Sequence, residues 1–205
     1  MKVGIIGGTG AMGQALASCL SKSCEVMVGS RVPEKAVAAA AKIEGVRGAG
    51  NDEVSSWCQA AVIAIPFSAI GELAPLSGAL AGKLVMSTVN PLKREGTVLH
   101  YWAESGSAAE AIAAMLPTSR VCTGFNNVPV TFFTKGATQE IDILIAAASR
   151  ETFEEASGIV RMVPKARPLY VGPLSQAESV ERITVLELNA TRLNDAGRFS
   201  VKFVP

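Results

Sequence analysis

A glycine-rich segment directly after the first apolar run is the feature that most constrains the fold of this chain. Residues 2–6 form a β-branched run bounded by glycines, which predicts a buried strand. The motif GTGAMG follows at residues 8–13 and opens a helix expected at about residues 11–21. In this spacing Gly8 permits a tight turn, Gly10 lets the backbone approach a pyrophosphate, and Gly13 lets the helix pack on the strand. Because N–H groups of a first helical turn face phosphates, we expect a dinucleotide to bind at Gly8, Thr9, Gly10, Ala11, Met12 and Gly13.

The residues after the second expected strand, at 26–28, indicate which dinucleotide binds. NAD-preferring sites carry a carboxylate about 20 residues after the glycine loop, whereas this chain has Gly29 there. Ser30 can donate a hydrogen bond to a 2′-phosphate, and Arg31 can supply a bidentate guanidinium. Lys35 follows one helical turn later and can add a second cation. The segment therefore predicts NADP(H) binding, with a solvated basic turn as the alternative.

Alternating apolar strands and helices indicate the fold class. We expect further strands at residues 61–65, 84–86 and 121–123. Helices are expected at residues 33–43, from Asn51 or Asp52 to near Cys58, loosely over 69–80, and at 108–116, with an irregular polar segment at 90–107. This order predicts βαβ units with right-handed crossovers, and therefore a doubly wound parallel sheet.

The pattern changes after residue 125. A strand is expected at residues 141–146, a helix at 151–162, a strand at 167–171, a helix at 177–193 and an apolar tail at 199–204. We therefore predict an α/β protein with an N-terminal Rossmann domain at residues 1–125. A small C-terminal α/β domain at residues 126–205 would complete a cleft for the second substrate.

Composition narrows the classes of function. The formal net charge is +1, from 19 Lys+Arg against 18 Asp+Glu, so we expect neither nucleic-acid nor membrane-surface binding. No charged leader precedes the first strand, and the cytoplasm is the expected location. The four cysteines form no paired spacing, which predicts reduced thiols and no metal site. No Ser/His/Asp set or nucleophile elbow is visible, and the single histidine, His100, is expected at the surface.

Several motifs together resemble one enzyme family, the F420-dependent NADP oxidoreductases of archaea and some bacteria. The resemblance runs along essentially the whole chain. Its motifs are Gly7-Gly8-Thr9-Gly10, Gly29-Ser30-Arg31 with Lys35, Ala64-Ile65-Pro66-Phe67, the Asn90-Pro91 turn, Ser107-Ala108-Ala109-Glu110, Gly172-Pro173-Leu174 with Glu178-Ser179, and Val201-Lys202-Phe203.

This resemblance implies reversible hydride transfer between NADP(H) and the deazaflavin coenzyme F420 by a homodimer. In such enzymes the two cofactors stack face to face and hydride passes directly, so no acid, base or nucleophile is essential. The absence of catalytic motifs agrees with that chemistry. The resemblance also implies that both cofactors are held by Ile65, Pro66, Phe67, Asn90, Pro91, Leu92, Asn126, Val128 and Val130.

One departure concerns the hydride acceptor. Asn126 stands where some archaeal members have a histidine near the two rings, and it is a candidate positioning residue. An asparagine there also occurs in relatives that reduce ordinary flavins, such as the cytosolic domain of transmembrane ferric reductases. An NADPH-dependent flavin or ferric reductase using FMN or FAD is therefore the alternative.

Two further alternatives share the N-terminal fold. An imine or β-hydroxyacid reductase would usually add a large helical domain, for which only about 80 residues remain. An NADP-sensing regulatory domain would share the glycine loop but would need no second pocket.

Overall fold

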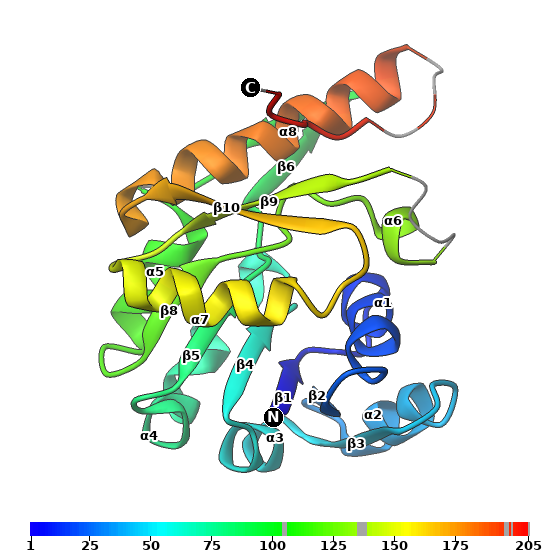
Figure 1. Ribbon diagram of the computed structural model, residues 1–205, viewed down its shortest axis with the longest axis vertical. Coiled ribbons are helices and arrows are strands. Elements are labelled where there is room, and N and C mark those ends of the chain that lie inside the picture. Colours follow the sequence, from blue (N-terminus) through cyan, green and yellow to red (C-terminus); the bar gives the residue numbers. More distant parts are fainter. Residues whose placement is uncertain (104–105, 135–138, 195–196, 198, 205) are drawn as a thin grey trace.

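A six-stranded parallel sheet forms the centre of the molecule (Figure 1), in the order β3-β2-β1-β4-β5-β8. This computed structural model describes residues 1–103, 106–134, 139–194, 197 and 199–204. The chain moves outward from β1 through β2 to β3 and then returns to the other side of β1 with β4, which makes a topological switch point there. The predicted doubly wound parallel sheet is confirmed. Its strands are β1 (Lys2–Ile6), β2 (Glu25–Ser30), β3 (Val46–Gly50), β4 (Ala60–Ile63), β5 (Leu84–Ser87) and β8 (Arg120–Thr123).

Helices cover both faces of this sheet, because side chains alternate between the faces along each strand. On β1, Val3 and Ile5 pack in one buried cluster, whereas Ile6 packs in the other. The first cluster includes side chains of α1 (Ala11–Leu20), α2 (Pro33–Ala40) and α7 (Arg150–Val160). The second includes side chains of α3 (Asn51–Trp57), η1 (Phe67–Leu76), α4 (Ser77–Leu80) and α5 (Ala108–Met115).

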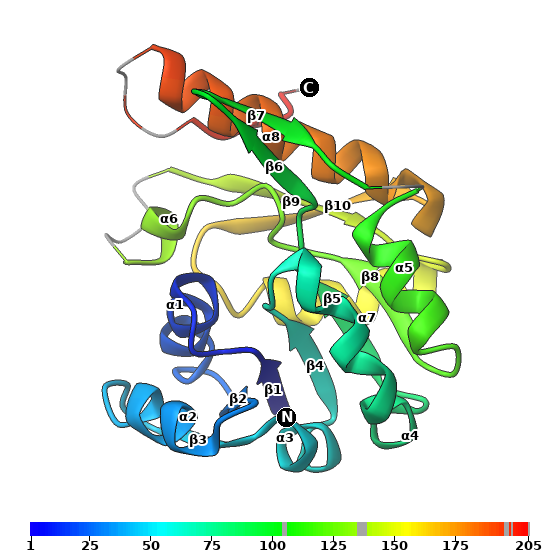
Figure 2. The same cartoon turned by 180° about the vertical axis from the view of Figure 1, so that it is seen from behind.

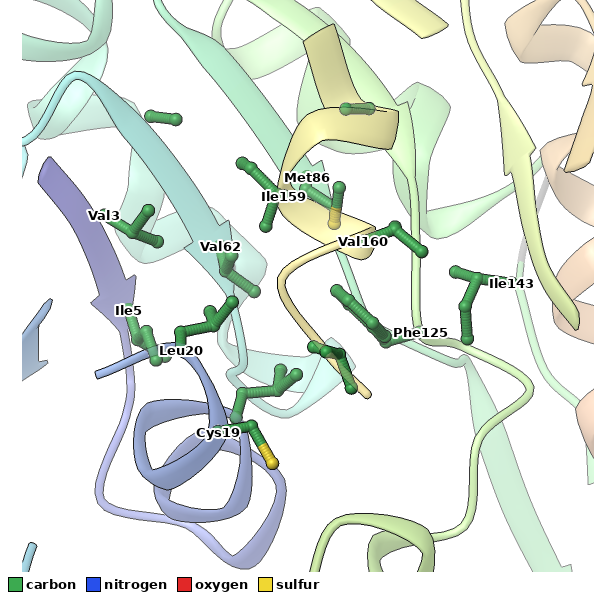
Figure 3. Close-up of a cluster of buried hydrophobic side chains, with 14 of the residues drawn as sticks. Val3, Ile5, Cys19, Leu20, Val62, Met86, Phe125, Ile143, Ile159 and Val160 are labelled. Carbon is green, nitrogen blue, oxygen red and sulfur yellow. The ribbon is translucent and has the colours of Figure 1, made fainter. Parts of the chain in front are cut away.

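The first cluster contains side chains from both the part of the chain before residue 125 and the part after it (Figure 3). Val3 and Met86 of the parallel sheet belong to it together with Ile143 and Ile159 from beyond residue 125. Phe125 belongs to the same cluster, is fully buried, and meets the Phe133 ring edge to face at a centroid distance of 5.9 Å. The predicted boundary at residue 125 therefore falls inside a shared hydrophobic core.

The C-terminal part is a smaller α/β unit, as predicted. Strands β9 (Ile141–Ala146) and β10 (Ala166–Gly172) pair in parallel, with α7 as their crossover. Helix α8 (Ala177–Leu193) lies across them, and a hairpin of β6 (Leu92–Glu95) and β7 (Val98–Tyr101) runs along it (Figure 2). Short elements α6 (Val130–Thr134) and η2 (Leu174–Gln176) complete this part. In the described ranges no helix is long and apolar enough to cross a membrane.

Three elements differ from the sequence-based expectations. The edge strand β3 was not expected, because its sequence VRGAG has no apolar alternation. The hairpin β6–β7 occupies a segment expected to be irregular, since its first strand, LKRE, is exposed throughout. The loosely helical segment is mostly a 3-10 helix, η1, which contains Gly71 and Pro75.

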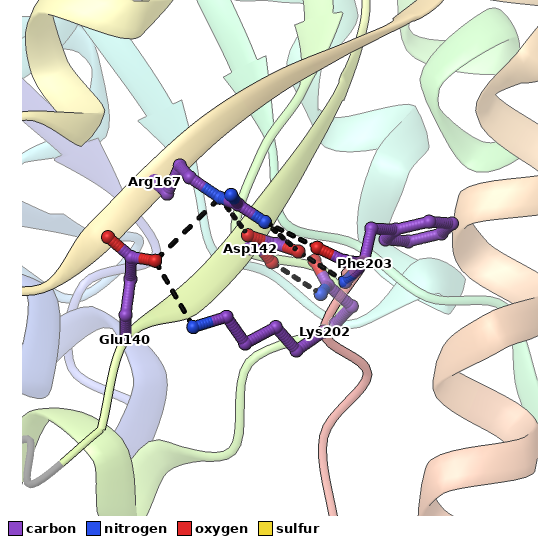
Figure 4. Close-up of polar contacts among 6 residues, drawn as sticks. Glu140, Asp142, Arg167, Lys202 and Phe203 are labelled. Carbon is purple, nitrogen blue, oxygen red and sulfur yellow. Dashed lines mark hydrogen bonds and ion pairs between the residues drawn. The ribbon is translucent and has the colours of Figure 1, made fainter. Parts of the chain in front are cut away.

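Ion pairs and hydrogen bonds attach the C-terminal tail to the β9–β10 pair (Figure 4). Arg167 donates two hydrogen bonds to the Asp142 carboxylate, at 2.6 and 3.0 Å. The Phe203 N–H also donates to that carboxylate, and the Phe203 carbonyl accepts from Arg167 at 2.7 Å. Burial tends to raise the pKa of Asp142, but these bonds outweigh it and the pKa is lowered. An ion pair between Lys202 and Glu140, at 3.2 Å, adds to the attachment.

Candidate functional site

A cavity of about 530 Å³ lies at the carboxyl ends of β1, β2 and β4, at the switch point of the sheet. We call it the nucleotide cavity. It brings together ten of the residues that the sequence predicted: Thr9, Gly10, Ala11, Met12, Ser30, Arg31, Ile65, Pro66, Phe67 and Asn90. It is also lined by residues that were not among the predicted cofactor contacts, namely Gly7, Asn51, Ala64, Ala69, Glu72, Thr88 and Val89.

The glycines of the loop at residues 8–13 have different structural roles. A side chain at Gly10 would meet no atom within 4 Å, so the space above this backbone is open to a ligand. Gly8 and Gly13, which were also expected to contact the dinucleotide, do not line the cavity. The backbones of Gly8 and Gly13 approach each other closely, since a Cβ at Gly13 would lie 2.5 Å from the Gly8 Cα. Gly10 also caps α1 without a side-chain hydrogen bond, which leaves N–H groups of the first turn available to phosphates.

The segment after β2 forms one wall of the nucleotide cavity. A Cβ at Gly29 would lie 2.5 Å from Asn51 Oδ1, so glycine lets Asn51 approach and accept a hydrogen bond from the Gly7 N–H at 3.3 Å. Ser30 is buried, and its hydroxyl accepts from the Val32 N–H at 3.1 Å. Arg31 is exposed and pairs with Glu72 at 2.7 Å.

Lys35, by contrast, lies exposed in the first turn of α2 and does not line the cavity. The sequence placed it one helical turn from Arg31, but the structure does not bring it to the cavity lining.

A second cavity, of about 210 Å³, adjoins the first. We call it the acceptor cavity. Met12 and Asn90 line both cavities, so the two spaces meet at these side chains. Four further predicted residues line it: Leu92, Asn126, Val128 and Val130. Pro91 is buried and lines neither cavity, so its contact with a cofactor stays a prediction.

The acceptor cavity takes one wall from α8 and the C-terminal tail, which sequence reasoning missed. The residues concerned are Thr184, Glu187, Leu188, Thr191 and Phe199. They lie more than 50 positions after the β8 loop, and the helix pattern alone does not show which face meets that loop. The side-chain oxygens of Asn90 and Asn127 are buried and find no partner among the described residues. A buried polar atom without a partner calls for an explanation, and both of these atoms belong to residues that line the acceptor cavity.

Asn126 ties three segments together beneath the acceptor cavity. Its Nδ2 donates to the Val89 carbonyl and its Oδ1 accepts from the Gly124 N–H, both at 3.0 Å. Its own carbonyl accepts from Asn90 Nδ2 at 3.0 Å and from the Thr184 hydroxyl at 2.9 Å. Both ends of the amide are thus engaged by backbone, and Asn126 sets the relative positions of the β5 loop, the β8 loop and α8.

Glu187 is the one ionisable side chain among the described residues that line the acceptor cavity. It is 6% exposed, and burial raises the pKa of its carboxyl to about 7. The Val201 N–H donates to it at 2.7 Å, and the Phe199 N–H donates to the Thr191 hydroxyl at 3.2 Å. These bonds attach the tail to α8 and hold Phe199 in the cavity wall.

The remaining candidate reactive groups lie elsewhere. His100 lies on β7 with its side chain 52% exposed and lines neither cavity, in agreement with its expected surface position. All four cysteines are free thiols, and burial raises the pKa of each of them. No group of three or more ligating side chains that could hold a metal occurs in the part of the chain that the structure describes.

Comparison with known proteins matches this arrangement to one family. The model of the family described as NADP oxidoreductase, coenzyme F420-dependent, matches residues 2–91. The F420-dependent NADP reductase of Methanothermobacter marburgensis is 32% identical and covers 96% of both chains. The enzyme of the same name from Methanocaldococcus jannaschii is 26% identical, over 91% of this chain and 90% of its own.

Solved structures show the same fold. A crystal structure from Arthrobacter sp. FB24, provisionally described as an F420-dependent NADP-reductase, superposes with a TM-score of 0.89 at 19% identity and covers all of both chains. An imine reductase from Bacillus cereus has a TM-score of 0.67 at 22% identity, and the match spans 95% of this chain but 62% of that one. The 32% identity over nearly the full length of both proteins shows that the chain belongs to the F420-dependent NADP oxidoreductase family.

Proposed function

We propose that this protein catalyses reversible, direct hydride transfer between NADP(H) and the deazaflavin coenzyme F420. The observation that carries the proposal is the pair of adjoining cavities that share Met12 and Asn90. A direct transfer needs two ring systems held in contact and oriented, and two spaces that meet at shared side chains provide this. The names of the full-length relatives state both cofactors.

The nucleotide cavity suits NADP(H). The open space above Gly10 and the N–H groups of the first turn of α1 would receive the pyrophosphate. Arg31 lines the same cavity beside Ser30 and would bind the 2′-phosphate. The segment Ile65–Phe67 and Asn90 also line this cavity, and Asn90 lines the acceptor cavity as well.

The acceptor cavity suits a planar ring with polar edges. Leu92, Val128 and Val130 supply apolar walls, and the unpartnered oxygens of Asn90 and Asn127 lie close behind them. When bound, NADPH supplies the hydride and the deazaflavin accepts it. The residues of the chain bind the two cofactors, orient their rings and exclude water, and we assign none of these residues a covalent role. Asn126 is a positioning residue that acts through the loops it joins.

The test is oxidation of NADPH by the purified protein with F420, FMN or FAD as the acceptor. We expect loss of NADPH absorbance with F420, and deuterium from C4-labelled NADPH on the deazaflavin without exchange into water. Faster reduction of FMN or FAD than of F420 would support the flavin reductase alternative. Binding of NADPH with no reduction of any acceptor would overturn the proposal and favour a nucleotide-sensing domain.

The family resemblance also supports a homodimer, which we propose as the assembly. Light scattering coupled to size exclusion would measure the mass directly. A mass near the 21.3 kDa of one chain would contradict it.

A further inference from the structure

An ion pair spans the mouth of the nucleotide cavity. Arg31 Nη1 donates to Glu72 Oε1 at 2.7 Å, and both residues line the cavity. Arg31 follows β2, whereas Glu72 belongs to η1, which follows β4. Strands β2 and β4 lie on either side of β1, so the pair connects the two walls that flank the glycine loop.

This pair is weak enough to open. The side chains of Arg31 and Glu72 are 72% and 41% exposed, and ion pairs of such exposure are screened by water and salt. In the described part of the chain, Glu72 is the one ion-pair partner of Arg31. When this ion pair opens, only the contact between Arg31 and Glu72 breaks, and the whole guanidinium becomes available to a ligand.

The pair competes with the ligand that Arg31 is proposed to bind. A phosphate monoester carries about −1.5 to −2 charges near neutral pH, and arginine binds it through two parallel hydrogen bonds. A carboxylate on the same guanidinium takes one of those donors and repels the incoming phosphate. Lys35 is exposed and lies outside the cavity lining, so it does not neutralise Glu72 there.

We infer that Glu72 sets the affinity and the release of the 2′-phosphorylated nucleotide by holding Arg31 in the nucleotide-free protein. The inference rests on the proposed NADP(H) function. The 2′-phosphate displaces Glu72 when the nucleotide enters, and Glu72 recaptures Arg31 when it leaves. A nucleotide with a free 2′-hydroxyl lacks the charge that displaces Glu72, so its binding leaves the pair closed.

The test is calorimetric titration of the Glu72→Gln variant with two probes that lack nicotinamide, 2′,5′-ADP and 5′-AMP. Glutamine keeps the size of the side chain and removes its charge. We expect 2′,5′-ADP to bind about two- to fivefold tighter than to the parent, the range set by an exposed ion pair. Stopped-flow dissociation should slow, and 5′-AMP binding should stay the same.

The matched control is Glu155→Gln. Glu155 pairs with Arg120 at 2.8 Å with a similar 40% exposure, but it lies outside both cavities, so the variant changes the net charge equally. In an Arg31→Ala background the effect of Glu72→Gln should disappear. Unchanged or weaker 2′,5′-ADP binding by Glu72→Gln would overturn the inference, as would equal tightening by Glu155→Gln or tightening that persists without Arg31. A parent protein that binds 2′,5′-ADP no better than 5′-AMP would instead overturn the proposed NADP(H) site.

Discussion

Two glycines of the same loop should respond in opposite ways to the same substitution. A methyl group at Gly10 meets no atom within 4 Å, and the backbone there (φ −75°, ψ 169°) is open to any residue. A methyl group at Gly13 would lie 2.5 Å from the Gly8 Cα and 2.8 Å from the Gly8 carbonyl atoms. Both neighbours are backbone, so α1 or the loop must move. We therefore predict that Gly13→Ala affects stability and that Gly10→Ala affects nucleotide binding.

The magnitudes follow from these contacts. Overpacking of this kind costs roughly 1–3 kcal/mol, and alanine recovers about 0.5–1 kcal/mol over glycine within a helix. Because the contacts are with backbone atoms, the upper half of the overpacking range applies, and Gly13→Ala should lower the free energy of unfolding by about 1–2.5 kcal/mol, or Tm by about 2–10 °C for a chain of this length. Gly10→Ala places a methyl group where the pyrophosphate would lie. Losing one charge-assisted hydrogen bond there costs about 1.5–3 kcal/mol, which weakens NADPH binding about 10- to 150-fold.

Thermal melts and NADPH titrations of both variants beside the parent separate the two effects. Gly10→Ala should lose less stability than Gly13→Ala, because its methyl group meets no neighbouring atom, although alanine is a poorer helix N-cap than glycine by roughly 0.5–1 kcal/mol. If Gly10→Ala binds NADPH as tightly as the parent, the backbone at Gly10 does not approach the phosphates. If Gly13→Ala melts at the parent temperature, α1 does not pack against Gly8 as closely as the structure indicates.

Three further predictions concern stability. Gly158→Ala should raise the free energy of unfolding by about 0.5–1 kcal/mol, because this glycine is exposed within α7 and a methyl group there meets nothing within 4 Å; an unchanged urea midpoint would contradict it. Asp142→Ala should lower the free energy of unfolding by about 2–3 kcal/mol, which is below the range for fully buried pairs because the Arg167 side chain is 34% exposed. The variant should also leave the C-terminal tail open to proteolysis, since the Phe203 N–H loses its acceptor. A tail still protected from protease would contradict this. Burial raises the pKa of Glu181 to about 7 from 4.5, so the folded state holds its proton longer than the unfolded state. Stability should therefore fall as pH rises from about 4.5 to about 7 and level off above that, and a urea series whose stability rises over this range would show the opposite sign.

The sequence alone determined the parts of this protein that depend on short stretches of chain. A buried apolar run, a glycine loop and a helix start lie within residues 2–20, so their geometry follows from local backbone chemistry. The same holds for Gly29, whose missing carboxylate indicates NADP(H), and for α8, which was expected at residues 177–193 and occupies Ala177–Leu193. The doubly wound parallel class of the sheet also follows, because right-handed crossovers leave few ways to arrange alternating strands and helices, although the edge strand β3 was not expected.

Contacts between distant segments required the tertiary structure. Glu72 lies 41 positions from Arg31, and no local pattern pairs an exposed acid with that guanidinium. In the sequence, Thr184 and Glu187 are ordinary polar positions on an amphipathic helix. Only the structure shows that α8 places them at the acceptor cavity, next to the loop after β8. Asn126 was expected as a positioning residue, but its hydrogen bonds to the Val89 carbonyl and the Gly124 N–H could not be read from the sequence. The physical reason is common to all three cases: side-chain periodicity shows which face of an element is buried, but only packing shows what that face meets.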